Sequence, residues 1–347
     1  MGTETVSGIA HDRVDRWLEE HVDDLAPPFR YELIAGGRSN LTFDVVDGNG
    51  RRVVLRRPPL GEVLQSAHDM GREHRIIAAL APTAVPVPAA LGFCGDPDVT
   101  GAPFYVMERV DGLVLRAAED VPPAFGERAR RHLAASIVGV LADLALLDPD
   151  DVGLGELGRR EGYVERQLRR WHAQFQKSRT RDIPVIDEVH RRLASHVPDQ
   201  QRVSIVHGDF RIENTILGAD GTVRAVLDWE LCTLGDPLAD LGWLAAYWVE
   251  PGDAAPHMPL RQPTVLPGFG TRDELVARYV EHTGLDASAL DFYVALALWK
   301  LACIAEGVHA RYRAGVMGHD DAAATERFGD QVLALARAAL ERCEGLR

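Results

Sequence analysis

Apolar positions in the first 112 residues follow two kinds of pattern. Residues 31–57 hold three short β-prone runs, YELIAG, LTFDVVDG and RRVVLRR, separated by Gly-containing turns, and FYVMERVDG at 104–112 is a fourth. Runs of this kind, bounded by turn residues, predict strands. Apolar residues recur at helical spacing over 10–25 and 62–80, which predicts two amphipathic helices. The N-terminal part of the chain is therefore expected to be a sheet accompanied by helices.

The pattern changes after residue 112, where long helical periodicities dominate. Helices are predicted at 126–147, 162–178, 185–196, 236–249, 272–283, 288–313 and 322–343. Two short strand-like pieces, VSIVHG and VRAVLDW, interrupt them, and the Pro-rich piece 251–270 is expected to be a long ordered loop or lid. The predicted fold class is α+β, with a small β-rich lobe of about 110 residues before a larger, mostly helical lobe.

Length and composition agree with this division. The chain has 347 residues, 46% of them apolar and 26% charged, which is ordinary for a globular protein with room for two lobes. The net charge of -14 disfavours binding to nucleic acid or to anionic membranes. We find no stretch with the roughly 18 to 20 apolar residues of a membrane span, and no signal-peptide pattern at the N-terminus.

Cysteine usage favours a reducing compartment. The four cysteines, Cys94, Cys232, Cys303 and Cys343, are widely spaced and form no CxxC pair, which argues against a disulfide framework or a zinc site. We therefore expect a cytoplasmic protein without nucleic-acid or membrane partners.

Residues 206–217, VHGDFRIENTIL, place several polar side chains between apolar ends. The carboxylate of Asp209 can accept the proton of a substrate hydroxyl, and the amide oxygen of Asn214 can bind a hard cation. Asp and Asn are also common turn residues, so this motif alone has a purely structural explanation. The run VRAVLDW then brings Asp228 to a strand end. Two carboxylates and an amide suit one or two Mg²⁺ ions that bridge nucleotide phosphates.

The β-rich part holds two candidate phosphate contacts. The Gly-containing turn in IAGGRSNLTFDVV, residues 34–46, permits close approach of backbone N–H groups to phosphate oxygens, although most Gly-Gly hairpins are only turns. In VVLRRPP, alternation puts Arg56 on one face of a strand and Arg57 on the other, and Glu73 of the following helix can pair with Arg56. Two solvated charges on an edge strand are the alternative explanation.

The ordered set of Gly turn, strand cation, helix Glu, HGDFRIEN and VLDWE resembles the aminoglycoside phosphotransferase (APH) family, relatives of the protein kinases. The resemblance covers residues 30–345. It implies a protein-kinase-like two-lobe fold, with residues 1–107 as the N-terminal helix and nucleotide-binding lobe. Residues 108–112 would be the hinge, and residues 113–347 the catalytic and substrate-binding lobe.

The resemblance also implies a role for each candidate residue. Asp209 would be the catalytic base, and Asn214 and Asp228 would hold Mg²⁺. Arg56 would contact the α- and β-phosphates of ATP and pair with Glu73. Kinase-like folds usually carry Lys where this chain has Arg56, and Arg replaces a point charge by a planar fork. It therefore stays open which arginine of the RR pair contacts the phosphates.

Further nucleotide contacts follow from the same resemblance. The backbone from Glu108 to Val110 would hydrogen-bond the adenine, with Met107 at its back wall. The turn over the phosphates would comprise Gly36, Gly37, Ser39 and Asn40.

Three polar residues are expected to support the site. His207 would shape the catalytic loop. Asp236 is followed by Pro237, which is typical of an N-cap and first residue of a helix, so its role has a structural explanation. Asp240 would brace the catalytic loop from the first turn of that helix.

Residues 159–181 bear on the phosphate acceptor. They contain eight Arg and Lys residues against two Glu, inside an acidic chain. One explanation is a solvated basic face whose aliphatic stems cover apolar surface. The other is an anionic acceptor, for which Arg166 and Arg170 are candidate contacts. Aminoglycosides are polycations, so they suit this segment less well.

The stretches GYVERQLRRW and KLACIAEGVHARYRAG, the latter at 300–315, are similar to one branch of the family. That branch includes kinase domains fused to acyl-CoA dehydrogenases, which implies phosphorylation of a 4-hydroxyacyl-CoA. We expect an ATP- and Mg²⁺-dependent kinase of a small-molecule hydroxyl, with a hydroxyacyl-CoA or another anionic acceptor. The alternatives are a kinase of an aminoglycoside, a macrolide or an amino alcohol such as choline. An alternative from another class is a nucleotide-binding regulator without turnover, which the presence of Asp209, Asn214 and Asp228 disfavours.

Overall fold

The computed structural model describes residues 7–34, 40–60, 69–253, 258, 261–315 and 322–346. The chain forms two compact units. The first comprises Met1–Gly112 with Arg224–Glu230, and the second Leu113–Val223 with Leu231–Arg347. A small antiparallel sheet lies in the first unit and most helices lie in the second, which confirms the predicted α+β class. The first unit is thus assembled from two pieces of chain, and the second piece lies far beyond the predicted hinge.

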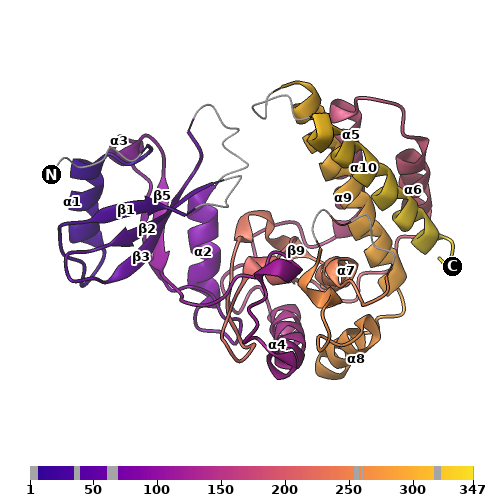
Figure 1. Ribbon diagram of the computed structural model, residues 1–347, viewed down its shortest axis with the longest axis horizontal. Coiled ribbons are helices and arrows are strands. Elements are labelled where there is room, and N and C mark those ends of the chain that lie inside the picture. Colours follow the sequence, from indigo (N-terminus) through magenta and orange to yellow (C-terminus); the bar gives the residue numbers. More distant parts are fainter. Residues whose placement is uncertain are drawn as a thin grey trace. The chain divides into compact units, whose positions relative to one another are not determined.

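The sheet of the first unit has five strands in the order β1-β2-β3-β5-β4 (Figure 1). Every neighbouring pair in it is antiparallel. The elements of this unit are α1 (His11–His21), β1 (Arg30–Leu33), β2 (Leu41–Val46), β3 (Arg52–Arg57), α2 (Met70–Leu80), β4 (Ala90–Cys94), α3 (Pro97–Thr100) and β5 (Phe104–Glu108). The sequence analysis missed β4, whose apolar run is interrupted by Gly92, and α3, which has only four residues.

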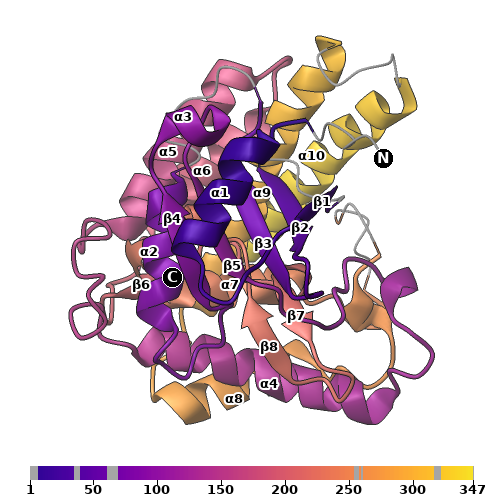
Figure 2. The ribbon, with the colours of Figure 1, turned by 90° about the vertical axis from the view of Figure 1, so that its left-hand side faces the viewer.

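One face of this sheet forms a hydrophobic core with α1, which lies across the strands in Figure 2. Trp17 of α1 is buried there with Phe43 of β2 and Phe104 of β5. Gly92 of β4 is needed for this packing, because a Cβ at that position would lie 2.9 Å from the Trp17 ring. Alternate side chains of each strand point to the opposite face, and that face carries the polar cluster described below.

The second unit consists mainly of helices. They are α4 (Glu127–Leu146), α5 (Tyr163–Ser178), α6 (Pro184–Ser195), α7 (Leu238–Tyr247), α8 (Arg272–Thr283), α9 (Leu290–Arg313) and α10 (Ala322–Cys343). Short strands accompany them: β6 (Ser204–Val206) pairs antiparallel with β9 (Thr233–Gly235), and β7 (Thr215–Leu217) follows the HGDFRIEN stretch. Strand β8 (Val223–Val226) begins at the last residue before the chain passes into the second piece of the first unit. The sequence analysis predicted β6 and β8 but not β7 and β9, which have three residues each.

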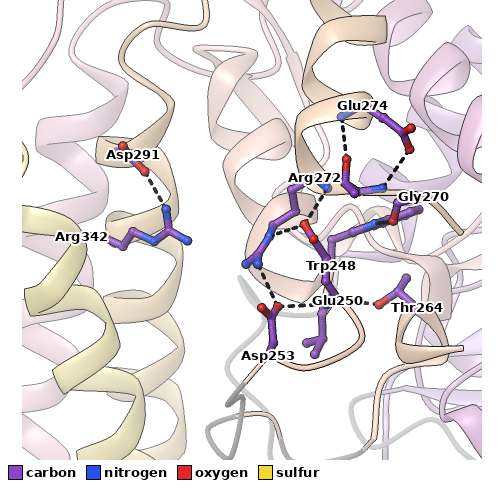
Figure 3. Close-up of polar contacts among 11 residues, drawn as sticks. Trp248, Glu250, Asp253, Thr264, Gly270, Arg272, Glu274, Asp291 and Arg342 are labelled. Atoms are coloured by element: carbon purple, nitrogen blue, oxygen red, sulfur yellow. Dashed lines mark hydrogen bonds and ion pairs between the residues drawn. The ribbon is translucent and has the colours of Figure 1, made fainter. Parts of the chain in front are cut away.

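Helix α9 is the central helix of the second unit and packs against α5, α6, α7 and α10 (Figure 1). By length and composition alone it could cross a membrane, with a mean hydropathy of 1.3. The expectation that no stretch is apolar enough was therefore wrong. Since 78% of the 18-residue apolar stretch in this helix is buried within the protein, the composition is that of a core helix. An ion pair between Asp291 and Arg342, 2.8 Å, joins α9 to α10 (Figure 3).

The described ends of the Pro-rich segment 251–270 are fastened by polar contacts (Figure 3). The guanidinium of Arg272 at the start of α8 binds the carboxylates of Glu250, 3.1 Å, and Asp253, 2.8 Å. Trp248 donates its indole N–H to the carbonyl of Gly270. These contacts fix where the segment leaves α7 and enters α8.

Candidate active site

A buried polar cluster occupies the face of the first unit's sheet that lies opposite α1. Arg56 of β3 and Tyr105 of β5 are direct neighbours in the antiparallel register. The guanidinium of Arg56 lies 3.2 Å from the carboxylate of Glu73 on α2 and 2.7 Å from Oδ1 of Asp228. Tyr105 donates its hydroxyl to Glu73, 3.0 Å. The predicted pairing of Arg56 with Glu73 is therefore confirmed.

The two neighbouring arginines of β3 have different surroundings, as alternation along the strand requires. Arg57 lies on the α1 face, where its guanidinium donates to the carbonyls of Gly8 and Thr100. Burial without a carboxylate partner lowers the pKa of Arg57. Arg57 therefore joins the N-terminal segment to α3, and Arg56 is the arginine that lies beside Asp228.

Electrostatics in this cluster favour a permanent charge on Arg56. Burial opposes that charge, but Tyr105, Glu73 and Asp228 outweigh it and raise the pKa of Arg56. Burial raises the pKa of Glu73, and Arg56 offsets this only in part. The cluster holds one guanidinium between two carboxyl groups, of which Asp228 is the more exposed, with 31% of its side chain accessible.

Asp228 has a backbone conformation that is rare for a residue with a side chain. Its φ is +66°, in the left-handed region that costs a non-glycine residue about 1 kcal/mol or more. Trp229 fixes this corner because its indole N–H donates to the carbonyl of Val226, 3.0 Å. Strain of this kind at the end of a strand is typical of functional residues. Asn40, near the start of β2, donates its amide to Glu73 and Glu230 in the same unit, 3.4 Å each.

In the second unit, the loop after β6 presents the carboxylate of Asp209. Its Oδ1 accepts the indole N–H of Trp243 from α7, 2.8 Å, and lies 3.2 Å from Nε of Arg211. Its Oδ2 accepts the side-chain amide of Asn214, 2.8 Å, which also donates to the Asp209 carbonyl. Donors from three directions therefore hold the carboxylate in one orientation.

The backbone of this loop is held from below by two helices. Asp240 of α7 accepts the N–H groups of His207, 2.6 Å, and Gly208, 2.8 Å. Lys300 of α9 donates its ammonium to the carbonyl of Gly208, 2.8 Å. Asp240 thus braces the loop as predicted, and the ring nitrogen Nδ1 of His207 lies 3.2 Å from the N–H of Asp209.

Gly208 is a position that only glycine fills without strain. Its φ is +85°, and a Cβ there would lie 3.0 Å from Cβ and from the carbonyl oxygen of Leu231. The left-handed turn aims the next residue, Asp209, away from the strand. The backbone conformation therefore explains why the middle residue of the HGD sequence is glycine.

Burial shifts the pKa values of two groups beneath the loop, in each case toward the neutral form. Burial raises the pKa of Asp240, although His207, Gly208 and Lys300 counteract it. Burial lowers the pKa of Lys300 to about 8, against the attraction of Asp209 and Asp240. Both shifts follow from the cost of removing a charge from water.

The donor chemistry fits a hard divalent cation. Among the described residues no group of three or more His, Cys, Asp or Glu side chains is placed to hold a metal. In the second unit, Asn214 uses its amide N–H₂ on Asp209, which leaves its oxygen as an acceptor. In the first unit, Asp228 engages Arg56 through Oδ1, which leaves Oδ2. Amide and carboxylate oxygens are the ligands Mg²⁺ takes.

Among the predicted nucleotide contacts, Gly36, Gly37 and Ser39 lie outside the described residues. Met107 is buried on β5, and the N–H of Glu108 donates to the carbonyl of Ala89, 2.9 Å, so this donor is not available to an adenine. The carbonyl of Val110 accepts the guanidinium of Arg109.

Asp236 has the structural role that the sequence indicated. Its carboxylate accepts the N–H of Leu238 at the start of α7, 2.9 Å, and the hydroxyl of Tyr293, 2.7 Å. It is therefore a buried cap that joins α7 to α9.

The two candidate acceptor contacts on α5 differ in structure. Arg166 donates its guanidinium to the carbonyls of Arg159 and Glu161, so it ties down the loop before its own helix. That use favours the structural interpretation for Arg166. The guanidinium of Arg170 lies 5.4 Å from the ring centre of Trp171, in the region that also contains Lys300.

Cations and aromatic rings alternate along one row of side chains in the second unit. Lys300 lies 5.4 Å from the ring centre of Trp171 and 4.2 Å from that of Trp243. Trp243 contacts Tyr247, and Arg211 lies 4.9 Å from the Tyr247 ring centre. We call this set the cation–ring row: Arg170, Trp171, Lys300, Trp243, Tyr247 and Arg211.

The sequence analysis missed Tyr105, Trp243 and Lys300. Trp243 follows Asp240 by three residues on α7, so helical spacing could have put both on the face toward the loop. A charge inside the apolar stretch 290–302 was the available signal for Lys300.

Comparison with known proteins gives relatives over most of the chain. Residues 30–293 match the profile of the phosphotransferase enzyme family (APH). Acyl-CoA dehydrogenase family member 11 of Gallus gallus is 37% identical over 318 residues, which is 88% of this chain and 39% of that protein. The chain thus spans about two fifths of the length of this curated relative.

Solved structures show the same fold. A protein from Ralstonia eutropha JMP134, provisionally described as an aminoglycoside phosphotransferase, is 30% identical with a TM-score of 0.80, over 95% of this chain and 98% of that one. Choline kinase from Cryptosporidium parvum Iowa II is 12% identical with a TM-score of 0.66, over 95% of each chain. These likenesses confirm the kinase-like fold. More distant structures of the same fold were solved with ADP, AMP-PNP or GDP.

Proposed function

The chain belongs to the phosphotransferase enzyme family, and we propose that it transfers the γ-phosphoryl group of ATP to a hydroxyl of a small anionic molecule. The observation that carries this proposal is the carboxylate of Asp209. It is held by the indole of Trp243, 2.8 Å, and the amide of Asn214, 2.8 Å, in a loop braced by Asp240. Phosphoryl transfer depends mainly on positioning and charge neutralisation, and these hydrogen bonds position the carboxylate.

Asp209 is the proposed base. The acceptor hydroxyl donates its proton to the carboxylate of Asp209 as its oxygen bonds to the γ-phosphorus, and the bond to the β-phosphate oxygen breaks to release ADP. The donors on Asp209 fix the direction of its lone pairs, which a base within hydrogen-bond reach needs. Asn214 therefore has two proposed tasks: its N–H₂ orients Asp209, and its oxygen is a ligand.

Asn214 and Asp228 are the proposed Mg²⁺ ligands. When bound, Mg²⁺ would neutralise charge on the β- and γ-phosphates. The strained backbone of Asp228, φ +66°, and the uncommitted oxygens of both side chains support this assignment.

Arg56 is the proposed contact to the α- and β-phosphates, in place of the usual lysine. Its guanidinium has two carboxylate partners in the first unit, Glu73 and Asp228. Glu73 fixes the guanidinium from α2, and a planar guanidinium is a shape that suits phosphate oxygens. Asn40 belongs to the same polar cluster and would join the phosphate-covering turn.

The cation–ring row supports an anionic acceptor with apolar surface. Three cations, Arg170, Lys300 and Arg211, alternate with rings in the unit that holds Asp209. Such a row attracts an anion and repels a polycationic aminoglycoside. A hydroxyacyl thioester of CoA is both anionic and apolar, and the name of the curated relative includes acyl-CoA dehydrogenase. We therefore propose a hydroxyacyl-CoA as the first acceptor to test.

We also propose that the protein works in the cytoplasm, without nucleic-acid or membrane partners. The four cysteines are free and buried, which suits a reducing compartment, and the net charge of -14 disfavours polyanionic partners.

An acceptor screen tests the proposed function. Release of ADP from Mg-ATP would be measured with 4-hydroxyacyl-CoAs, choline, an aminoglycoside and a macrolide, with Asp209→Asn as the inactive control. We expect acceptor-dependent ADP release with the CoA thioester and none with the control. Turnover with choline or an antibiotic alone would reject the anionic acceptor, and nucleotide binding without turnover on any acceptor would favour a regulator.

A further inference from the structure

Lysine is rare in this chain. Of the 38 Lys and Arg residues, only Lys177 and Lys300 are lysines. Lys177 is exposed on α5, whereas Lys300 is only 8% exposed on α9. Arginine thus supplies almost every cation, and the one buried ammonium lies next to the catalytic loop. Lysine differs from arginine because its compact charge can be lost near neutral pH when it is buried.

The surroundings of Lys300 combine apolar burial with one strong acceptor. Its ammonium lies 4.2 Å from the ring centre of Trp243 and 5.4 Å from that of Trp171, and donates to the carbonyl of Gly208, 2.8 Å. Cation–π contacts partly replace water around a buried ammonium. Burying a lysine charge is costly unless it is paired, so an apolar residue would have been the simpler choice if packing were all that mattered here.

The contacts of Lys300 converge on the peptide group that carries Asp209. The Gly208 carbonyl belongs to the Gly208–Asp209 peptide, so Lys300 fixes the plane of that peptide from α9. Trp243 receives the ammonium on its ring and donates its own N–H to the Asp209 carboxylate, 2.8 Å. Lys300 therefore reaches Asp209 along two routes, one through the backbone and one through the indole.

We propose that Lys300, as an ammonium, is a positioning residue for Asp209: it holds the Gly208 carbonyl and the Trp243 indole, and through them the carboxylate that accepts the acceptor proton. This proposal rests on the proposed function. Because the group is an amine, its charge and hence the activity would change with pH.

The charged and titratable groups around Lys300 come from each neighbouring segment. Asp240 lies on α7, Arg170 and Tyr163 on α5, and Asp209 on the loop; Tyr293 of α9 lines the same small cavity. Burial lowers the pKa of Lys300 to about 8, and the two carboxylates oppose that shift. The ammonium is thus present at neutral pH and is lost as the pH rises through about 8.

NMR of lysine labelled with ¹³C at Cε tests the electrostatic part without any acceptor. The labelled chain gives two lysine signals, and Lys177→Arg identifies which is which. We expect the Lys300 signal to titrate near pH 8, and Asp209→Asn to lower that pKa because a nearby negative charge is lost. A Lys300 pKa close to the free value, or one that Asp209→Asn leaves unchanged, would overturn the proposal.

Kinetics test the positioning part with Mg-ATP and the acceptor found by the screen. Lys300→Met should lower kcat by about 10- to 100-fold with little change in the KM for Mg-ATP, and should remove the loss of activity above pH 8. Lys300→Arg keeps a permanent charge, so it should recover part of kcat without that alkaline loss. Lys177→Met is the matched control and should behave as wild type.

A failure of the proposed function and a failure of the Lys300 proposal give different results. If wild type releases no ADP with any acceptor, the proposed function fails, and the NMR titration still decides whether Lys300 senses Asp209. If Lys300→Met keeps its fold by circular dichroism and keeps wild-type kcat and pH profile, Lys300 has only a structural role. If Lys300→Met does not fold, the test compares the pH profiles of Lys300→Arg and wild type. An identical loss of activity above pH 8 in both would reject the proposal.

Discussion

The two units of this protein each bury one cation beside a functional carboxylate, and they do so differently. In the first unit Arg56 has direct carboxylate partners, Glu73 and Asp228, and its pKa is raised. In the second unit Lys300 has rings and a carbonyl as its nearest partners, and burial lowers its pKa to about 8.

The difference separates a permanent charge from a titratable one. Direct ion pairing favours the charged form, whereas burial against neutral groups disfavours it. A phosphate contact needs its charge at every pH, which suits Arg56. A group that orients a base can depend on pH without impairing nucleotide binding. We therefore expect substitution of Arg56 to change nucleotide affinity and substitution of Lys300 to change turnover.

The largest expected effect separates turnover from nucleotide affinity. Asp209→Asn should lower kcat by about 10²- to 10⁴-fold, because the base is lost while its shape is kept. The affinity for Mg-ATP, measured by calorimetry, should stay within a few-fold of wild type. A parallel loss of Mg-ATP affinity would contradict the assignment of Asp209 as a base that does not hold the nucleotide.

The stability difference between wild type and Lys300→Met should depend on pH. The pKa of Lys300 is about 8 in the folded chain, against 10.5 for an unperturbed lysine, so between these pH values the unfolded chain binds more protons. Wild type should therefore gain about 3 kcal/mol relative to Lys300→Met as the pH rises from 8 to 10.5. Urea unfolding at several pH values measures this, and a difference that is constant with pH would show that Lys300 is not buried as an ammonium.

Asp228→Ala should affect binding rather than the chemical step. Loss of one proposed Mg²⁺ ligand should weaken Mg-ATP binding by about tenfold or more, seen as a smaller thermal shift with nucleotide. Glu19→Ala, an exposed change on α1 of the same unit, is the control. Unchanged Mg-ATP affinity in Asp228→Ala would remove Asp228 from the proposed site.

The smallest expected effect concerns the acceptor. Arg170→Met should raise the KM for an anionic acceptor by about 3- to 10-fold, as loss of one charge contact does. Arg166→Met should leave this KM unchanged, because the Arg166 guanidinium binds backbone carbonyls. Arg169→Met, exposed on the same helix, is the control. Equal effects of all three would indicate a general field of the basic helix rather than a specific contact.

Much of this architecture was predictable because helical periodicity is a local signal. The helix predicted at 272–283 has the same bounds as α8, where Thr271 and Glu274 form a capping box. The short strand β9 was missed because three residues are too few to show a period. Its partner β6 lies about 30 residues earlier, so the pairing depends on tertiary contacts.

The site was predictable to the extent that its chemistry is local in sequence. Asp209 and Asn214 are five residues apart, and their hydrogen bond follows from that spacing. Lys300 contacts Gly208 across 92 residues, and such a contact leaves no mark on the sequence near either residue. Arg166 shows the opposite error. Its charge suggested a contact to a ligand, but its guanidinium binds backbone carbonyls just before the start of its own helix.

The burial of Lys300 has a practical consequence for amine chemistry. Apart from the amine of Met1, the sequence offers reagents such as succinimidyl esters only two primary amines, and one of them is enclosed by Trp171 and Trp243. Of the two lysines, mild acylation should therefore modify Lys177, on the exposed side of α5. A biotin or dye attached there would give a uniformly oriented protein on a sensor surface, with the base Asp209 and its supporting helices chemically unaltered.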